Sequence, residues 1–161
     1  MKQKAYLGYG ANLGEPRNMI QVSVRSLDKL PESTVSAVSS LYRSKPLGTT
    51  TPQPDYYNAV IELETGLSAD KLMEAMHKIE SANGRIRPAA VNSARTLDLD
   101  LLLYGKMATE DGSLTLPHPR IQERAFVLYP LLELAPDIEI PGLGRAADLL
   151  SRVSGQDIER V

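Results

Sequence analysis

Two aspartates interrupt the apolar run RTLDLDLLLYG at residues 95–105. Side chains on a β-strand alternate between its faces, so Asp98 and Asp100 share one face of a strand here. The other face then holds Leu97, Leu99, Leu101 and Leu103. The leucine face can form a core, so the two carboxylates are expected to face water or a ligand.

The spacing of this carboxylate pair suits divalent cations. Two residues along a strand separate the Cα atoms by about 6.5 Å. Suitable rotamers would let the oxygens hold two metal ions about 3.5–4 Å apart. Hard oxygen ligands whose shell is completed by phosphates are typical of Mg²⁺. The alternative is that the pair is the hydrated face of an amphipathic sheet.

The segment that leads into this run is basic. Between Gly84 and Leu97 the chain carries Arg85, Arg87 and Arg95 and no acidic residue. Guanidinium groups match phosphate oxygens. A cationic loop beside an acidic pair therefore favours transfer of a nucleotide phosphate, with the loop as a lid that excludes water. The alternative is a solvated basic hairpin that pairs with nearby acids.

A second basic segment, LPHPRIQERAF, follows downstream and supplies His118, Arg120, Arg124 and the only phenylalanine, Phe126. The histidine stands between two prolines, whose rigid backbone suits a positioned donor to phosphate. The alternative is a turn with an exposed imidazole. The other histidine, His77, is one residue off an apolar helical stripe and is expected on the surface.

The glycines near the start form the pattern G-x-G-x-x-x-G at Gly8, Gly10 and Gly14. This spacing misses the dinucleotide-binding fingerprint by one residue, and no G-x-x-x-x-G-K-[ST] loop occurs. We therefore interpret these glycines as serving a tight turn and close strand packing.

Hydrophobic periodicity predicts the elements that must position these side chains. Strands are expected at 4–9, 34–43, 57–65 and 96–104, and a short strand at 114–116. Helices are expected at 16–30, from the N-cap Ser68 to a terminator at Gly84, at 126–135 and, weakly, at 145–153. The order through residue 104 is β-α-β-β-α-β. It predicts an α+β, ferredoxin-like antiparallel sheet with both helices on one face, followed by a C-terminal extension.

Composition limits the remaining possibilities. A length of 161 residues allows one domain, 1–161, with a real core. The net charge of −2 argues against a nucleic-acid partner. The apolar run at the start, MKQKAYLGYG, is too short for a signal peptide, and the sequence has no 18-residue apolar stretch. We expect a cytoplasmic protein with no membrane partner.

These motifs together resemble a known family. RTLDLDLL, with GRIR upstream and LPHPR…RAF downstream, is similar to the 6-hydroxymethyl-7,8-dihydropterin pyrophosphokinases of folate biosynthesis. YGANLG, SSLYRSKPLG and QPDYYNAV follow the family's order over nearly the whole chain. The resemblance implies a ferredoxin-like monomer. Its activity would transfer the β,γ-pyrophosphoryl group of ATP to the pterin hydroxymethyl oxygen, with two Mg²⁺ ions, and release AMP.

The resemblance also implies roles for single residues. It implies metal binding by Asp98 and Asp100. It also implies that the loop residues Arg85 and Arg95 contact the triphosphate and stabilise charge during transfer. Further ATP contacts are implied for Thr115, His118 and Arg124. The pterin would stack between Tyr56 and Phe126, with Asn58 at its amide edge. Further pterin contacts are implied for the segment that contains Ser44, Lys45 and Leu47.

Two other classes of function remain open from the residues alone. A metal-dependent nuclease or nucleotidyltransferase can use the same D-x-D pair, and it would cleave nucleic acid or release pyrophosphate instead of AMP. A ferredoxin-like module that binds a ligand or RNA is the non-enzymatic alternative. RNA-binding sheets of this shape carry aromatic residues on central strands, whereas this chain carries aspartates there.

Overall fold

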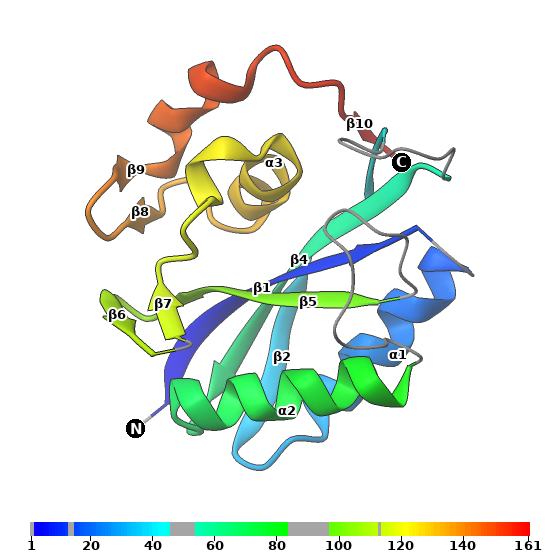
Figure 1. Cartoon of the computed structure of the whole chain (residues 1–161), viewed down its shortest axis with the longest axis vertical. Coiled ribbons are helices and arrows are strands. Elements are labelled where there is room, and N and C mark those ends of the chain that lie inside the picture. Colours follow the sequence, from blue (N-terminus) through cyan, green and yellow to red (C-terminus); the bar gives the residue numbers. More distant parts are fainter. Residues whose placement is uncertain (1, 13–14, 46–53, 84–96, 113) are drawn as a thin grey trace.

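The computed structural model describes residues 2–12, 15–45, 54–83, 97–112 and 114–161. Its centre is a six-stranded antiparallel sheet (Figure 1). The strands of this sheet are β1 (Gln3–Ala11), β2 (Ser33–Val38), β3 (Tyr42–Ser44), β4 (Tyr56–Thr65), β5 (Asp98–Tyr104) and β10 (Glu159–Arg160). They follow the order β10-β3-β4-β1-β5, and β2 also pairs with β4. This order confirms the predicted ferredoxin-like α+β fold.

Helices cover both faces of the sheet. The helices α1 (Pro16–Asp28) and α2 (Ala69–Ala82) lie on one face, and α3 (Ala125–Leu134) lies on the other (Figure 1). The α3 side is completed by η1 (Ile121–Glu123), η2 (Ala146–Val153) and the hairpin of β8 (Glu139–Ile140) with β9 (Gly144–Arg145). In a second hairpin, β6 (Thr109–Asp111) pairs with β7 (Leu114–Leu116), whose two leucines pack into the core beneath α1 and α2. None of the helices that the structure describes is long and apolar enough to span a membrane.

Local signals in the sequence place the first two helices. Pro16 occupies the first turn of α1, where its missing N–H has no intrahelical partner to lose. The Ser68 hydroxyl caps α2 by accepting a 3.2 Å hydrogen bond from the Lys71 N–H. Leu72, Met76 and Ile79 of α2 then pack into the core on the α1–α2 side of the sheet, as their spacing predicts.

The β4 strand confirms the alternation that its sequence predicts. Ala59, Ile61 and Leu63 are buried in the core beneath α1 and α2, whereas Val60 belongs to a second core beneath α3 and η2. The sheet is therefore covered on both faces, and any site on it must open near its ends or edges.

The predicted strand 34–43 is interrupted. It forms β2 and β3, which pair with different parts of β4 and are separated by residues 39–41. In this gap the N–H of Ser40 donates a 2.8 Å hydrogen bond to the Glu133 carboxylate rather than to a strand. A distant side chain thus breaks a segment whose local sequence favours one continuous strand.

One predicted side-chain orientation is wrong. Leu97, Leu99 and Leu101 pack in the core beneath α1 and α2, but Leu103 lies in the α3 core with Leu102. The pairing of β1 with β5 shifts its register between Tyr6 and Leu7, where partners Leu103 and Leu101 skip Leu102. This bulge reverses the alternation after residue 102.

Candidate active site

A row of residues crosses the sheet at the end of β1. Gly10 pairs with Asn58 of β4 on one side and with Asp98 of β5 on the other. Neighbouring strands are about 4.8 Å apart, so Asn58 and Asp98 lie about 10 Å apart across the glycine. We refer to Asn58, Gly10 and Asp98 as the site floor. The next glycine, Gly8, pairs with Asp100 in the same way.

Gly10 lies where the sheet has no space for a side chain unless Asn58 moves. A Cβ atom at this position would lie 2.8 Å from the Asn58 amide nitrogen, which is closer than real Cβ contacts allow. At Gly8 the same atom would meet the Leu102 side chain at an ordinary 3.5 Å. Both glycines belong to the strand β1 and neither has a positive φ, so the predicted tight turn at these two positions is wrong. The close packing predicted with it is confirmed at Gly10. Gly14 lies outside the described residues.

The two aspartates lie where the alternation predicts. Asp98 and Asp100 are partly exposed, while Leu99 between them is buried on the opposite face. Within the described part of the chain, no group of three or more His, Asp or Glu side chains could hold a metal ion. A pair of carboxylates nevertheless fits Mg²⁺, because this ion commonly takes one or two carboxylates and completes its shell with substrate phosphates and water.

A buried acid supports the strand that carries these aspartates. Glu80 of α2 is fully buried, and its carboxylate accepts a 2.8 Å hydrogen bond from the N–H of Leu99. β5 is the last strand of the sheet on its side, so this N–H has no neighbouring strand to bond. Sequence reasoning missed Glu80. Its only local signal is a carboxylate next to Ile79 on the buried face of an amphipathic helix.

His118 lies beside β5 and is largely withdrawn from water. Its backbone N–H donates to the Leu102 carbonyl at 3.0 Å, and its Nδ1 accepts from the Arg120 N–H at 3.1 Å. Burial and the positive charges of Arg124 and Arg120 lower the pKa of His118 to about 4, although Asp98 acts in the opposite direction. The imidazole is therefore neutral at pH 7, and its proton is on Nε2, which makes Nε2 a hydrogen-bond donor.

Asn58 has an unused acceptor. Its side chain is buried and its Nδ2 donates to the Tyr9 carbonyl at 3.4 Å. Its Oδ1 is the one buried side-chain polar atom without a hydrogen-bond partner among the residues that the structure describes. Such an orphaned group costs about 1–3 kcal/mol. A ligand that donates a hydrogen bond to Oδ1 would remove this cost.

Aromatic and basic residues lie on the same side of the sheet as α3. Tyr56 lies two residues before Asn58 on the same face of β4, and Ser44 of β3 pairs with it. Phe126 at the start of α3 is partly buried against the α3 core, and the Arg124 guanidinium lies 5.4 Å from the centre of its ring. One face of Phe126 thus carries a cation–π contact.

The other predicted site residues are placed as follows. Thr115 is partly buried in the middle of β7, and Lys45 is exposed directly after β3. Arg85, Arg95 and Leu47 lie outside the described residues. The predicted surface position of His77 is confirmed.

Comparison with known proteins connects this geometry to a family. The sequence profile of 7,8-dihydro-6-hydroxymethylpterin-pyrophosphokinase (HPPK) matches residues 6–136. A 2-amino-4-hydroxy-6-hydroxymethyldihydropteridine pyrophosphokinase of Pseudomonas aeruginosa is 42% identical over 161 residues, which cover 100% of this chain and 98% of the relative. A protein of the same name from Haemophilus influenzae is 41% identical over 137 residues, which cover 85% and 84% of the two chains.

Solved structures give the same fold at low sequence identity. A crystal structure of an HPPK-DHPS in complex with substrates matches with a TM-score of 0.70 at 10% identity, over 94% of this chain. This chain spans 43% of the length of that solved chain.

Proposed function

The chain belongs to the 7,8-dihydro-6-hydroxymethylpterin-pyrophosphokinase family, and on this premise we propose that its site floor is where acceptor and phosphate donor meet. The chain is a pyrophosphokinase of folate biosynthesis with ATP as its co-substrate. It transfers the pyrophosphoryl group of ATP to the hydroxymethyl oxygen of 6-hydroxymethyl-7,8-dihydropterin, which gives the pterin diphosphate and AMP.

Asn58 would hold the acceptor ring at one end of the site floor. The observation that carries this proposal is the unpartnered Oδ1 of Asn58, which is buried and can accept a hydrogen bond from an N–H of the pterin edge. Tyr56 and Phe126 lie on the same side of the sheet and would stack on the flat ring. Residues around Ser44 and Lys45 would add polar contacts next to Tyr56.

Asp98 at the other end of the site floor, together with Asp100 beside Gly8, would hold two Mg²⁺ ions. When bound, these ions would neutralise the charge of the triphosphate and favour the deprotonated form of the attacking hydroxyl. Both aspartates lie on the same face of the sheet as Asn58, and Gly10, which has no side chain, lies between Asn58 and Asp98. A bicyclic ring bound at Asn58 would then lie over Gly10, with its hydroxymethyl group toward Asp98 and the phosphates.

The basic side of the site would bind the phosphate chain. His118 is neutral at pH 7 and would donate a hydrogen bond from Nε2 to a phosphate oxygen. Arg124 beside it would add a positive charge, and Thr115 a hydroxyl. Arg85 and Arg95, for which the family resemblance implies triphosphate contacts, would supply further positive charge.

Transfer would then be direct. The hydroxymethyl oxygen attacks the β-phosphorus, the bond from that phosphorus to the α,β-bridging oxygen breaks, and AMP leaves with the electron pair while the hydroxyl proton goes to water. The chain has no cysteine, and we propose no covalent enzyme intermediate. Catalysis would rest on positioning and on electrostatic stabilisation of the transferred group.

The products of one incubation test this function. Protein, ATP, Mg²⁺ and the reduced hydroxymethylpterin should give AMP and pterin diphosphate in equal amounts, and both should depend on the pterin. Pyrophosphate in place of AMP would indicate a nucleotidyltransferase and contradict the proposal. Binding of the pterin without turnover would indicate a binding module.

We also propose that residues 1–161 act as one domain and as a monomer. The two cores share one sheet, so the described elements have a common support. Light scattering of the purified chain at assay concentration should give the mass of one chain, 17.6 kDa. A mass of two chains or more would contradict the monomer.

A further inference from the structure

The strand β3 is three residues long and pairs with the acceptor end of the site. Tyr42 pairs with Asn58, Arg43 with Tyr57 and Ser44 with Tyr56. On the other side of β4, β1 pairs with Asn58 and Tyr57 but not with Tyr56, so β3 is the strand that supports both proposed pterin residues of β4. A strand this short is weakly held by its own pairing, and as an edge strand it would present unpaired backbone groups.

The C-terminal segment covers that outer edge. In β10, Glu159 pairs with Arg43 and Arg160 pairs with Tyr42. The row of the site floor thus continues from Asn58 through Tyr42 to Arg160, which lies on the fifth strand of the row. The Val161 N–H donates to the Leu41 carbonyl at 2.9 Å, and the Arg43 guanidinium donates to Glu159 at 2.8 Å. β10 lies beyond residue 136, where the match to the family profile ends.

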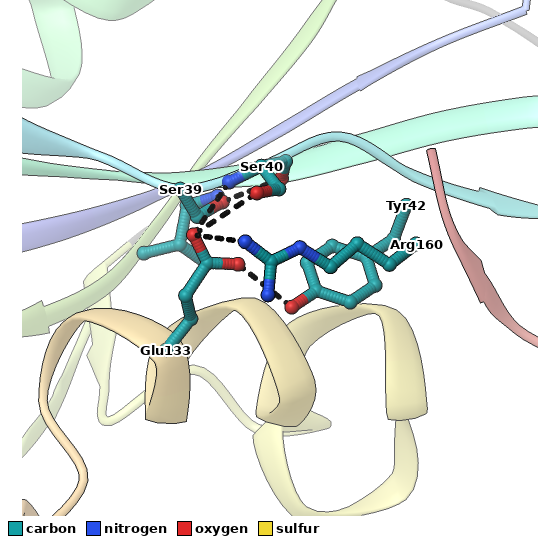
Figure 2. A network of polar contacts seen from close by, with 6 residues as sticks. Ser39, Ser40, Tyr42, Glu133 and Arg160 are labelled. Carbon is teal, nitrogen blue, oxygen red and sulfur yellow. Dashed lines mark hydrogen bonds and ion pairs between the residues drawn. The ribbon is translucent and has the colours of Figure 1, made fainter.

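A single carboxylate ties β3 and β10 to the helix α3. Figure 2 shows Glu133 of α3 pointing at the start of β3, with Arg160 beside it. Its carboxylate accepts hydrogen bonds from the Tyr42 hydroxyl at 2.7 Å and from the Ser40 N–H at 2.8 Å, and it lies 3.9 Å from the Arg160 guanidinium. We call Glu133, Tyr42, Ser40 and Arg160 the β3 clamp.

The β3 clamp connects the two elements that support the proposed pterin-binding residues. Its helix, α3, carries Phe126 at its start, and its strand, β3, pairs with Tyr56 and Asn58. The hydroxyl of Tyr42 is held by its 2.7 Å hydrogen bond to Glu133, and burial together with this bond raises the pKa of Tyr42 to about 12. The clamp therefore fixes the distance between Phe126 of α3 and the residues Tyr56 and Asn58 of β4.

We propose that Glu133 and its partners in the β3 clamp are positioning residues for the pterin, which act by fixing β3 and α3 relative to each other. The inference deepens the proposed function and rests on it. None of the clamp residues belongs to the proposed phosphate-binding groups, and of those groups only Arg124 adjoins α3, so the clamp should affect the acceptor more than ATP.

The chain supplies a matched control for the clamp. Glu62 of β4 is surrounded by the same types of group: the Tyr6 hydroxyl at 2.7 Å, the Ser36 hydroxyl at 2.8 Å and the Lys4 amine at 3.7 Å. This second cluster lies four residues along β4 from Asn58. Substitutions there remove comparable hydrogen bonds without touching β3.

The test compares Glu133→Ala and Tyr42→Phe with Glu62→Ala and Tyr6→Phe. Dissociation constants of the reduced pterin and of an unreactive ATP analogue are measured with Mg²⁺, and thermal unfolding is followed in parallel. A loss of about 1.4 kcal/mol of binding free energy raises a dissociation constant about tenfold. We expect this rise for the pterin in Glu133→Ala and a smaller rise in Tyr42→Phe. The ATP analogue should lose less affinity than the pterin in both clamp variants, and both control variants should bind both ligands as the wild type does.

The outcomes separate the two proposals. Wild-type protein that does not bind the pterin would contradict the proposed function. Wild-type protein that binds it, with unchanged pterin binding in Tyr42→Phe and Glu133→Ala, would overturn the clamp alone. An equal loss of pterin affinity in Glu62→Ala would also overturn it, because the effect would then follow stability rather than β3. Should Glu133→Ala not fold, Tyr42→Phe decides, since it removes a single hydroxyl.

Discussion

The carboxylate of Glu80 accepts a 2.8 Å hydrogen bond from the N–H of Leu99, the residue between Asp98 and Asp100. Glu80 is fully buried and comes from α2, on the opposite face of the sheet from the aspartates. The outermost strand of the sheet is thus fixed from behind at the point where it presents the carboxylate pair.

Replacing Glu80 should therefore disturb the aspartates as well as the fold. Glu80→Ala leaves the buried Leu99 N–H without this acceptor, which should lower the free energy of unfolding by about 1–3 kcal/mol. We expect kcat to fall as well, and Glu80→Gln, which keeps an acceptor oxygen, to recover part of it. The exposed Glu74 of the same helix gives a control, Glu74→Ala. A Glu80→Ala enzyme with wild-type kcat would contradict the positioning role.

Asn58 should be needed for binding and not for stability. Asn58→Ala removes the buried Oδ1 that has no partner in the free protein, and with it a penalty of about 1–3 kcal/mol. This gain should offset much of the lost packing and of the lost 3.4 Å hydrogen bond to the Tyr9 carbonyl, so chemical denaturation should show little loss of stability. The pterin dissociation constant should rise at least about tenfold. Unchanged pterin affinity would remove Asn58 from the site.

Gly10 and Gly8 should respond differently to the same added methyl group. Gly10→Ala brings a Cβ atom to 2.8 Å from the Asn58 amide and should push that side chain away, which raises the KM for the pterin. Gly8→Ala makes an ordinary 3.5 Å contact with Leu102 and should have a smaller effect. Steady-state kinetics of the two variants measure the difference. Equal kinetic effects would contradict the close contact at Gly10.

His118 should make the metal-free protein less stable in mild acid. Its pKa is about 4 in the folded chain and 6.5 unfolded, so between these values the unfolded chain binds the extra proton. The contribution of His118 to stability is therefore complete above pH 6.5, falls as the pH is lowered, and is lost by about pH 4. In His118→Asn, denaturation in EDTA at pH 5 and 7 should show a smaller difference than in the wild type. An equal stability difference in the two proteins would indicate that the His118 side chain is exposed to water in the folded chain.

Much of the fold follows from local patterns. The alternation of β4, the proline at the start of α1 and the Ser68 cap of α2 are all correctly predicted, because each depends on residues near in sequence. The order of these elements also predicts the ferredoxin-like sheet. The face of Asp98 and Asp100 follows from the same alternation.

The errors and omissions depend on residues far apart in sequence. The break between β2 and β3 depends on Glu133, about ninety residues away, and the reversed orientation of Leu103 depends on a bulge against β1. β10 is two residues long and carries no periodic signal. The role of Gly10 becomes visible only when the pairing of β1 with β4 and β5 is known.

The central claim is that Asp98 and Asp100 support pyrophosphoryl transfer at the site floor. The most direct measurement is the rate of AMP formation by wild type, Asp98→Asn and Asp100→Asn with ATP, Mg²⁺ and the reduced pterin, on variants whose unfolding matches the wild type. Loss of a group that stabilises transferred charge costs at least about 10²–10³ in rate, and we predict this loss or more for each variant. AMP formation by either folded variant at close to the wild-type rate would contradict the account.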